Sequence, residues 1–207
     1  MKGQIALVGG EEFRLRCEEM DREIMRASSQ DPVQVLIIPT AAISDPAKAA
    51  NDGMAHFEKL GAEAKRLMVL DKSHADNQDL VKSSRDAGVI YFTGGSPGHL
   101  LAGIKGSQLL RFIMQAVENG TVLAGSSAGA MVMGSMMNDP AAASGWTDAL
   151  AIVPGIVVLP HHEMSNPAQT GQQVQIQLPS GLTALGIDAR TACLGRPGSW
   201  RVVGSGN

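Results

Sequence analysis

The stretch that decides the fold reads Thr121-Val-Leu-Ala-Gly125-Ser-Ser127-Ala-Gly129-Ala-Met-Val-Met133. An apolar run typical of a buried strand leads into Gly-x-Ser-x-Gly, and small and apolar residues typical of a helix follow. A nucleophilic serine on a strained strand-to-helix turn requires this order, because glycines at 125 and 129 remove side chains that would collide with the strand and the helix. The stretch therefore predicts a parallel α/β sheet with Ser127 as its nucleophile.

The same turn predicts part of an oxyanion hole. A backbone N–H at the start of the following helix, that of Ala128, is placed to stabilise a developing negative charge. Ser126 is the rival hydroxyl, but alanines flank it where glycines flank Ser127. We expect Ser127 to be the reactive serine.

A second glycine turn, Phe92-Thr93-Gly94-Gly95-Ser96-Pro97-Gly98, follows another apolar run. Turns at the carboxyl ends of parallel strands share one rim of the sheet. The N–H groups of Gly94 or Gly95 can supply the other half of the oxyanion hole, with Gly95 as the main candidate. We expect Gly94 and Ser96 to contact substrate.

Apolar runs alternate with segments of helical period from the first residues to about residue 133, which predicts a layered α/β/α fold with a mostly parallel sheet. Predicted strands are 4–8, 33–38, 66–70, 89–92 and 121–124, and predicted helices are 11–27, 46–60, 76–84 and 106–118, with a further helix starting near His99.

Beyond residue 155 the pattern changes to short strands joined by turns, at 156–159, 184–187, 191–194 and 200–203, with a hairpin at Pro197-Gly198. No linker divides the chain, so we expect one domain over residues 1–207.

Histidine is the usual base for a serine nucleophile. His161 and His162 directly follow the predicted strand 156–159, which places them at a strand end, on the rim that Ser127 occupies. We expect His161 to act as base and His162 to contact substrate. His56 and His74 lie in helical and polar contexts typical of surface residues, and His99 fits a structural role.

An acid that orients the imidazole would complete a triad. Asp139, Asp148 and Glu163 are near enough in sequence, and the residues do not decide between them. No cluster of carboxylates or cysteines accompanies the histidine pair, so we expect neither a metal site nor a cofactor.

The composition and charge of the chain limit the classes of partner that it is expected to bind. Hydrophobic residues make up 44% and charged residues 18% of the chain, and the net charge is -3 without a basic run, which argues against nucleic acid. No apolar run is long enough to span a membrane, and no signal pattern is present at the N-terminus. The two cysteines, Cys17 and Cys193, lie far apart, as is typical of a reduced, cytoplasmic setting. The sequence is compatible with a homodimer.

Four spaced motifs together resemble the aspartyl dipeptidase (dipeptidase E) and cyanophycinase family of serine peptidases. They are Gly125-Ser-Ser127-Ala-Gly-Ala, Tyr91-Phe-Thr-Gly94-Gly95, Leu150-Ala-Ile-Val-Pro154-Gly-Ile-Val-Val-Leu-Pro-His161, and Gly186-Ile-Asp188 followed by Thr191-Ala. The resemblance implies a class I glutamine amidotransferase-like (flavodoxin-like) fold.

The resemblance also implies roles for single residues: Ser127 as nucleophile, His161 as base and Gly95 as the oxyanion-hole glycine. Asp188 matches a recurrent acidic position, and Ala189 stands where a second acid usually follows.

The function expected from all of this is hydrolysis of small peptides or amides through an acyl-enzyme. An α/β-hydrolase esterase is disfavoured because its histidine lies far downstream of the serine, and glutamine amidotransfer because that chemistry uses cysteine. The alternative from another class is a catalytically silent member of the same fold that binds a small ligand or partner.

Overall fold

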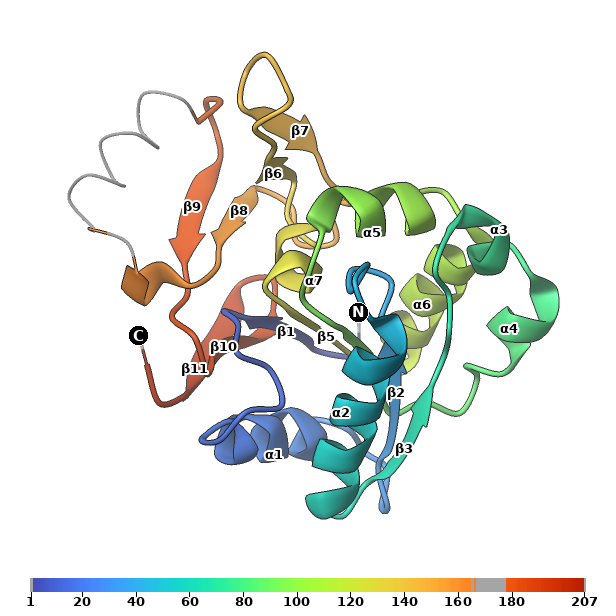
Figure 1. Cartoon of the computed structure of the whole chain (residues 1–207). Coiled ribbons are helices and arrows are strands. Elements are labelled where there is room, and N and C mark those ends of the chain that lie inside the picture. Colours follow the sequence, from blue (N-terminus) through green and yellow to red (C-terminus); the bar gives the residue numbers. More distant parts are fainter. Residues whose placement is uncertain (1, 165, 167–177, 207) are drawn as a thin grey trace.

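The computed structural model describes residues 2–164, 166 and 178–206, and it is built around a central sheet (Figure 1). The sheet has seven strands in the order β11-β10-β1-β5-β4-β2-β3. Strands β1, β5, β4, β2 and β3 pair in parallel, whereas β10 is antiparallel to β1 and to β11. The strands are Ile5–Val8 (β1), Gln34–Ile38 (β2), Glu63–Arg66 (β3), Val89–Phe92 (β4), Val122–Ser126 (β5), Thr191–Arg196 (β10) and Ser199–Gly204 (β11).

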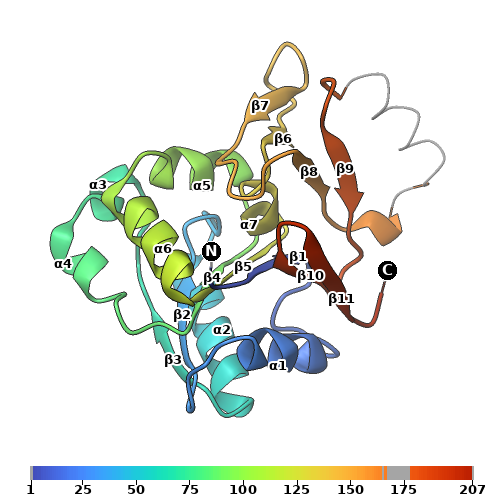
Figure 2. The same ribbon diagram turned by 180° about the vertical axis from the view of Figure 1, so that it is seen from behind.

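Helices cover both faces of this sheet, which confirms the predicted three-layer arrangement (Figure 2). Helices α1 (Glu18–Arg26) and α2 (Pro46–Lys59) pack Met20, Ile24 and Phe57 against one face. Helices α5 (Pro97–Ile104) and α6 (Gln108–Asn119) bury their apolar sides against the other face. Three short helices complete the fold: α3 (Lys72–Ala75), α4 (Gln78–Lys82) and α7 (Ala128–Met131).

Two small sheets lie beside the central one. A hairpin that the sequence did not predict joins β6 (Met136–Asn138) to β7 (Trp146–Asp148). Strand β8 (Ile156–Leu159) pairs in parallel with β9 (Thr183–Gly186) and forms no part of the central sheet. A 3-10 turn over His162–Met164 follows β8.

The largest departure from expectation is at the start of α1, which begins at Glu18 rather than Glu11. Glu11, Phe13 and Arg16 have positive φ angles, which a helix does not permit. Phe13 instead packs against Phe57 and Tyr91 at ring-centroid distances of 5.9 and 5.1 Å. The residues after β1 therefore form a wall loop, residues 11–17, at the surface next to α2.

The third strand is also shifted, to Glu63–Arg66 instead of 66–70. β3 is the edge strand of the sheet, and an edge strand tolerates polar residues. The prediction was displaced because it required an apolar run. Leu67 and Val69 come after the strand and are buried in the core.

No helix in the described ranges is both long and apolar enough to cross a membrane.

Candidate active site

Ser127 stands at the junction between β5 and α7 in a strained conformation. Its φ and ψ angles are 49° and -108°, outside the regions that side-chain-bearing residues favour. Its N–H donates to the carbonyl of Val8 on the adjacent strand β1, at 2.9 Å. Such strain is characteristic of a nucleophilic serine lifted above the end of a sheet.

The two glycines of the motif are required by close backbone approach, as the sequence predicted. A Cβ atom at Gly125 would lie 2.5 Å from the carbonyl oxygen of Gly129. A Cβ atom at Gly129 would lie 2.6 Å from the carbonyl oxygen of Phe92, on strand β4. Any larger residue at either position would therefore force the turn apart.

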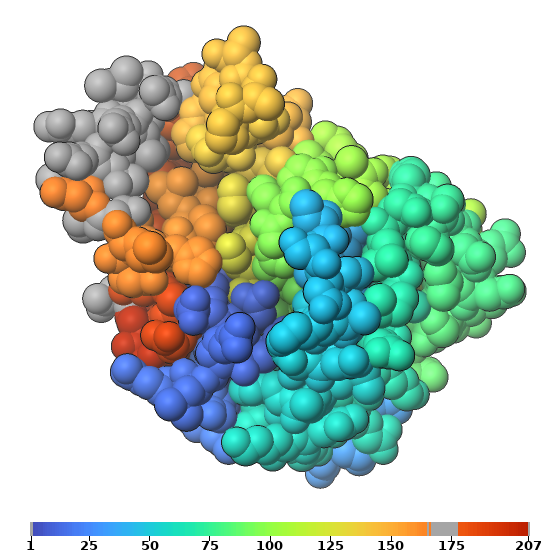
Figure 3. All heavy atoms as spheres, in the orientation of Figure 1, coloured from blue at the N-terminus to red at the C-terminus, as the bar shows by residue number. Residues whose placement is uncertain are grey.

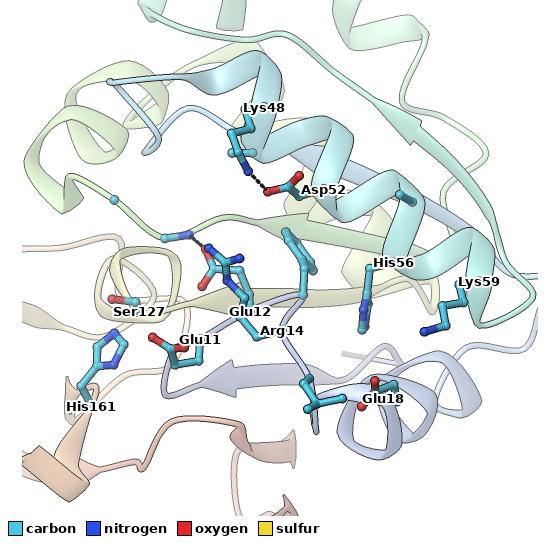
Figure 4. Close-up of a pocket in the computed structure, with 16 residues that line it drawn as sticks. Glu11, Glu12, Arg14, Glu18, Lys48, Asp52, His56, Lys59, Ser127 and His161 are labelled. Carbon is cyan, nitrogen blue, oxygen red and sulfur yellow. Dashed lines mark hydrogen bonds and ion pairs between the residues drawn. The ribbon is translucent and has the colours of Figure 1, made fainter.

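Ser127 and His161 line the same cavity, which has a volume of about 680 Å³. Figure 4 shows them at one end of it, with His56 and Lys59 at the other. No hydrogen bond joins the two side chains in the structure, and such bonds are often long until substrate binds. The arrangement brings a hydroxyl and an imidazole into one pocket.

His161 reaches the cavity by a route that the sequence did not predict. β8 is outside the central sheet, so His161 does not stand on the rim as the end of one of its strands. Its N–H instead donates to the carbonyl of Gly9, just after β1, at 2.8 Å. This bond fastens the residue to the rim, and its φ angle of 52° turns the chain there.

Two amides close to Ser127 in the sequence or on the cavity wall have no hydrogen-bond acceptor in the described ranges. The N–H groups of Gly95 and Ala128 donate to no acceptor within the described ranges. Gly95 has a φ angle of 136°, and a Cβ atom there would overlap the carbonyl of Ala41, so only glycine fits. The N–H of Gly94, by contrast, is already taken by Glu12 at 2.7 Å. Gly94 does not have the free amide that a substrate contact through its backbone would need.

The other expected substrate contacts face elsewhere. Ser96 caps α5, where its Oγ accepts from the N–H of His99 at 3.3 Å. His162 packs over Gly186, where a Cβ atom would lie 2.5 Å from Cδ2 of the ring. Neither residue is among those that line the cavity.

Two of the three expected triad acids have other partners, and the third is exposed. Asp139 sits in the β6–β7 turn and accepts from the N–H of Ala141 at 3.0 Å. Asp148 ends β7 and is exposed. Glu163 accepts from the N–H of Ala189 at 2.7 Å, next to Asp188. In the described part of the chain none of them bonds the imidazole of His161.

Sequence reasoning missed much of the cavity wall. The wall loop contributes two acids, of which Glu11 lies 3.4 Å from Arg190 and Glu12 bonds Gly94. Helix α2 contributes Lys48, Asp52 and His56, spaced four residues apart on one side of the helix. Figure 3 shows the blue wall loop between the cyan α2 and the orange segment after β8. The Gly9-Gly10 pair after β1 was a signal of a rim turn.

The expectation that His56 is a surface residue is wrong. Its side chain is 8% exposed, and Nε2 lies 2.8 Å from Oδ2 of the fully buried Asp21. Burial raises the pKa of the Asp21 carboxyl, although the bond to His56 opposes the shift. The sequence pattern placed His56 in a helix correctly but could not show that α1 supplies a buried partner.

In the described ranges no group of His, Cys, Asp and Glu side chains is arranged to hold a metal ion. Besides the charged side chains of its wall, the cavity contains the Ser127 hydroxyl and the His161 imidazole.

A strained serine at the end of a parallel strand, facing the same cavity as a histidine, defines a serine hydrolase of the three-layer α/β class. The chain matches the model of Peptidase family S51 over residues 5–198, and it belongs to that family of serine peptidases.

The relatives agree with this assignment. The chain is 27% identical to a cyanophycinase of Nostoc sp. strain PCC 7120, over 100% of this chain and 72% of the relative. A cyanophycinase of Trichormus variabilis is 26% identical over the same shares.

Solved structures show the same fold. A peptidase from an acI-B1 Actinobacterium superposes with a TM-score of 0.84 at 29% identity, over 99% of this chain and 88% of that one. A structure from Listeria monocytogenes EGD-e shares the fold with a TM-score of 0.70 at 19% identity, over 98% of each chain.

Proposed function

We propose that the protein hydrolyses an amide bond of small peptides through an acyl-enzyme on Ser127. The single observation that supports this most is the strained Ser127 in the same cavity as His161. Ser126 is the weaker candidate because it is fully buried and its hydroxyl already donates to Glu12 at 2.7 Å.

In the first half of the reaction, the oxygen of Ser127 attacks the peptide carbonyl carbon while the imidazole of His161 accepts the hydroxyl proton. The N–H groups of Gly95 and Ala128 stabilise the negative charge on the carbonyl oxygen. The carbon–nitrogen bond then breaks, and the proton passes from the imidazole to the leaving amine.

In the second half, a water molecule attacks the ester carbon of the acyl-enzyme. The imidazole takes a proton from this water and returns it to Oγ of Ser127 as the ester bond breaks. The free carboxylic acid leaves, and the serine is restored.

The size and charge of the cavity support a peptide substrate. A volume of about 680 Å³ is in the range of small-molecule sites. Its wall carries both signs of charge, with acidic residues such as Glu11 and Asp52 and basic residues that include Arg14, Lys48 and Lys59. A zwitterionic peptide has charges of both signs to match them.

The test is a screen of a dipeptide library together with labelling by a fluorophosphonate probe. Wild type should be labelled, Ser127→Ala should lose labelling and turnover, and Ser73→Ala, which removes an exposed serine outside the cavity, is the matched control that keeps the label. Labelling of Ser127→Ala at the wild-type rate would refute the assignment. An unlabelled but folded wild type would favour a binding protein of the same fold.

A further inference from the structure

We propose that Glu12 is a positioning residue that holds the oxyanion-binding amide of Gly95 in register with Ser127; this inference rests on the proposed function. Each carboxylate oxygen of Glu12 has one partner. Oε1 accepts from the N–H of Gly94 at 2.7 Å, and Oε2 accepts from Oγ of Ser126 at 2.7 Å.

The two partners are the residues immediately before the two working groups. Gly94 precedes Gly95, and Ser126 precedes Ser127. Glu12 thus connects the β4 turn to the β5 turn from a third segment, the wall loop after β1. Figure 4 shows the Glu12 carboxylate at the end of the cavity where Ser127 lies, joined to the turn by a dashed line.

This bridge acts where the sheet itself no longer holds the strands together. The pairing of β4 with β5 ends at Phe92 and Gly125, so Gly94 and Ser126 lie beyond the last paired residues. On its other side the β4 turn is held by the bond from the N–H of Ser96 to the carbonyl of Ala41, at 2.8 Å. Glu12 provides the bond on the side that faces the serine.

Packing at Gly94 is shaped to this carboxylate. A Cβ atom at Gly94 would lie 2.8 Å from Oε1 of Glu12, so a side chain at residue 94 would displace the acid. Ser126 is fully buried, and a buried hydroxyl requires a partner, which Glu12 supplies.

The geometry argues against a direct role of Glu12 in the reaction. Each oxygen of Glu12 already accepts one hydrogen bond from the protein, and neither oxygen bonds Ser127 or His161, so Glu12 does not act directly on either reacting side chain. The remaining role of Glu12 is to align the oxyanion-binding amide of Gly95 with Ser127. Oxyanion donors act only within a few tenths of an ångström of their ideal distance, and an error of about 1 Å can cost about 100-fold in rate.

Two conservative variants of Glu12 distinguish the effect of side-chain length from the effect of its negative charge. Glu12→Gln keeps the length of the side chain and can bond both partners, because its amide can donate to Oγ of Ser126. Glu12→Asp keeps the charge but is one methylene shorter and cannot reach both. Glu19→Ala, which removes an exposed acid of α1 outside the cavity, is the control for net charge.

The measurement is the rate of Ser127 labelling by fluorophosphonate–rhodamine, separated into the binding constant KI and the maximal rate kinact. We expect kinact to fall by about 100-fold in Glu12→Asp with KI within about threefold, and to stay within about fivefold of wild type in Glu12→Gln. Glu19→Ala should match wild type, and thermal melting should show all four proteins folded.

Equal kinact in Glu12→Asp and wild type would overturn the inference, as would an effect confined to KI. A Glu12→Gln variant as slow as Glu12→Asp would also overturn it, because charge would then matter rather than the two hydrogen bonds. These results leave the proposed function standing. If wild type itself resists the probe, the proposed function fails first, and this inference with it.

Discussion

The imidazole of His161 lies directly against the backbone of Gly10. A Cβ atom at residue 10 would overlap Cε1 and Nε2 of the ring and would lie 2.8 Å from Nδ1. Gly10 also has a φ angle of 137°, which a residue with a side chain rarely adopts. Since no described side chain bonds the ring, this contact limits where the imidazole can lie.

Gly10→Ala should therefore displace the base. We expect turnover of the best library dipeptide to fall by about 100-fold or more, because a shift of about 1 Å in a reacting group has that effect. Gly61→Ala is the matched control, since residue 61 has positive φ but no atom near its Cβ position. A Gly10→Ala enzyme of normal activity would show that the ring has room to move.

The two adjacent histidines should respond differently to substitution. His161→Ala should reduce kcat by about 100-fold to 10,000-fold, the range for loss of a general base. His162→Ala should keep most of its activity but unfold at a lower temperature, because that ring packs over Gly186. Steady-state kinetics and thermal melting of both variants check this, and a larger kcat loss in His162→Ala would reverse the assignment.

Cys17 should be inert in the native protein. Burial and the nearby charge of Asp21 raise the pKa of its thiol to about 11. At pH 8 the reactive thiolate is then about one part in a thousand. In a Cys193→Ser variant, which leaves Cys17 as the only thiol, Ellman's reagent should react only after guanidinium chloride is added. Rapid reaction without denaturant would contradict the burial of Cys17.

Asp21 should make stability depend on pH. Burial raises the pKa of its carboxyl above the ordinary 3.8, so protonation of this group is more favourable in the folded protein than in the unfolded chain. The stability from this group is complete below the unfolded-state pKa and is lost as pH rises through the folded-state pKa.

Asp21→Asn removes this ionisation but keeps an oxygen that can accept a hydrogen bond from Nε2 of His56. The variant should equal wild type in free energy of unfolding near pH 3 and exceed it at pH 7. Urea denaturation at several pH values measures the difference. A gain that is greatest in acid would contradict the sign.

The strand-to-helix turn at Ser127 could be predicted from sequence because its determinants are local. Strand, turn and helix lie within residues 121–133, and Gly125 and Gly129 mark the close approaches that the structure confirms. The strands in the middle of the sheet could be predicted equally well, because buried parallel strands are continuous apolar runs.

His161 was identified as a site residue by reasoning that the structure corrects. Proximity to a strand end suggested the rim, but β8 pairs with β9 instead of the central sheet. The bond from His161 to Gly9 joins residues far apart in the chain, and no local pattern encodes it.

The wall loop was predicted as a helix because its apolar residues have helical spacing. Phe13, Cys17, Met20 and Ile24 have helical spacing, yet only Met20 and Ile24 lie in α1. Phe13 satisfies the same hydrophobic requirement from a loop by joining Phe57 and Tyr91. Burial fixes which residues must be inside, but not the backbone that brings them there.

The wall loop and helix α2 make up most of the cavity lining, whereas Ser127 and His161 come from segments later in the chain. In the proposed reaction, most of the residues that would contact the peptide therefore lie on segments other than those that carry Ser127 and His161. Evolution, or an engineer, can exchange side chains such as Arg14, Lys48 and Lys59 for new peptide preferences while the cleavage apparatus is inherited unchanged.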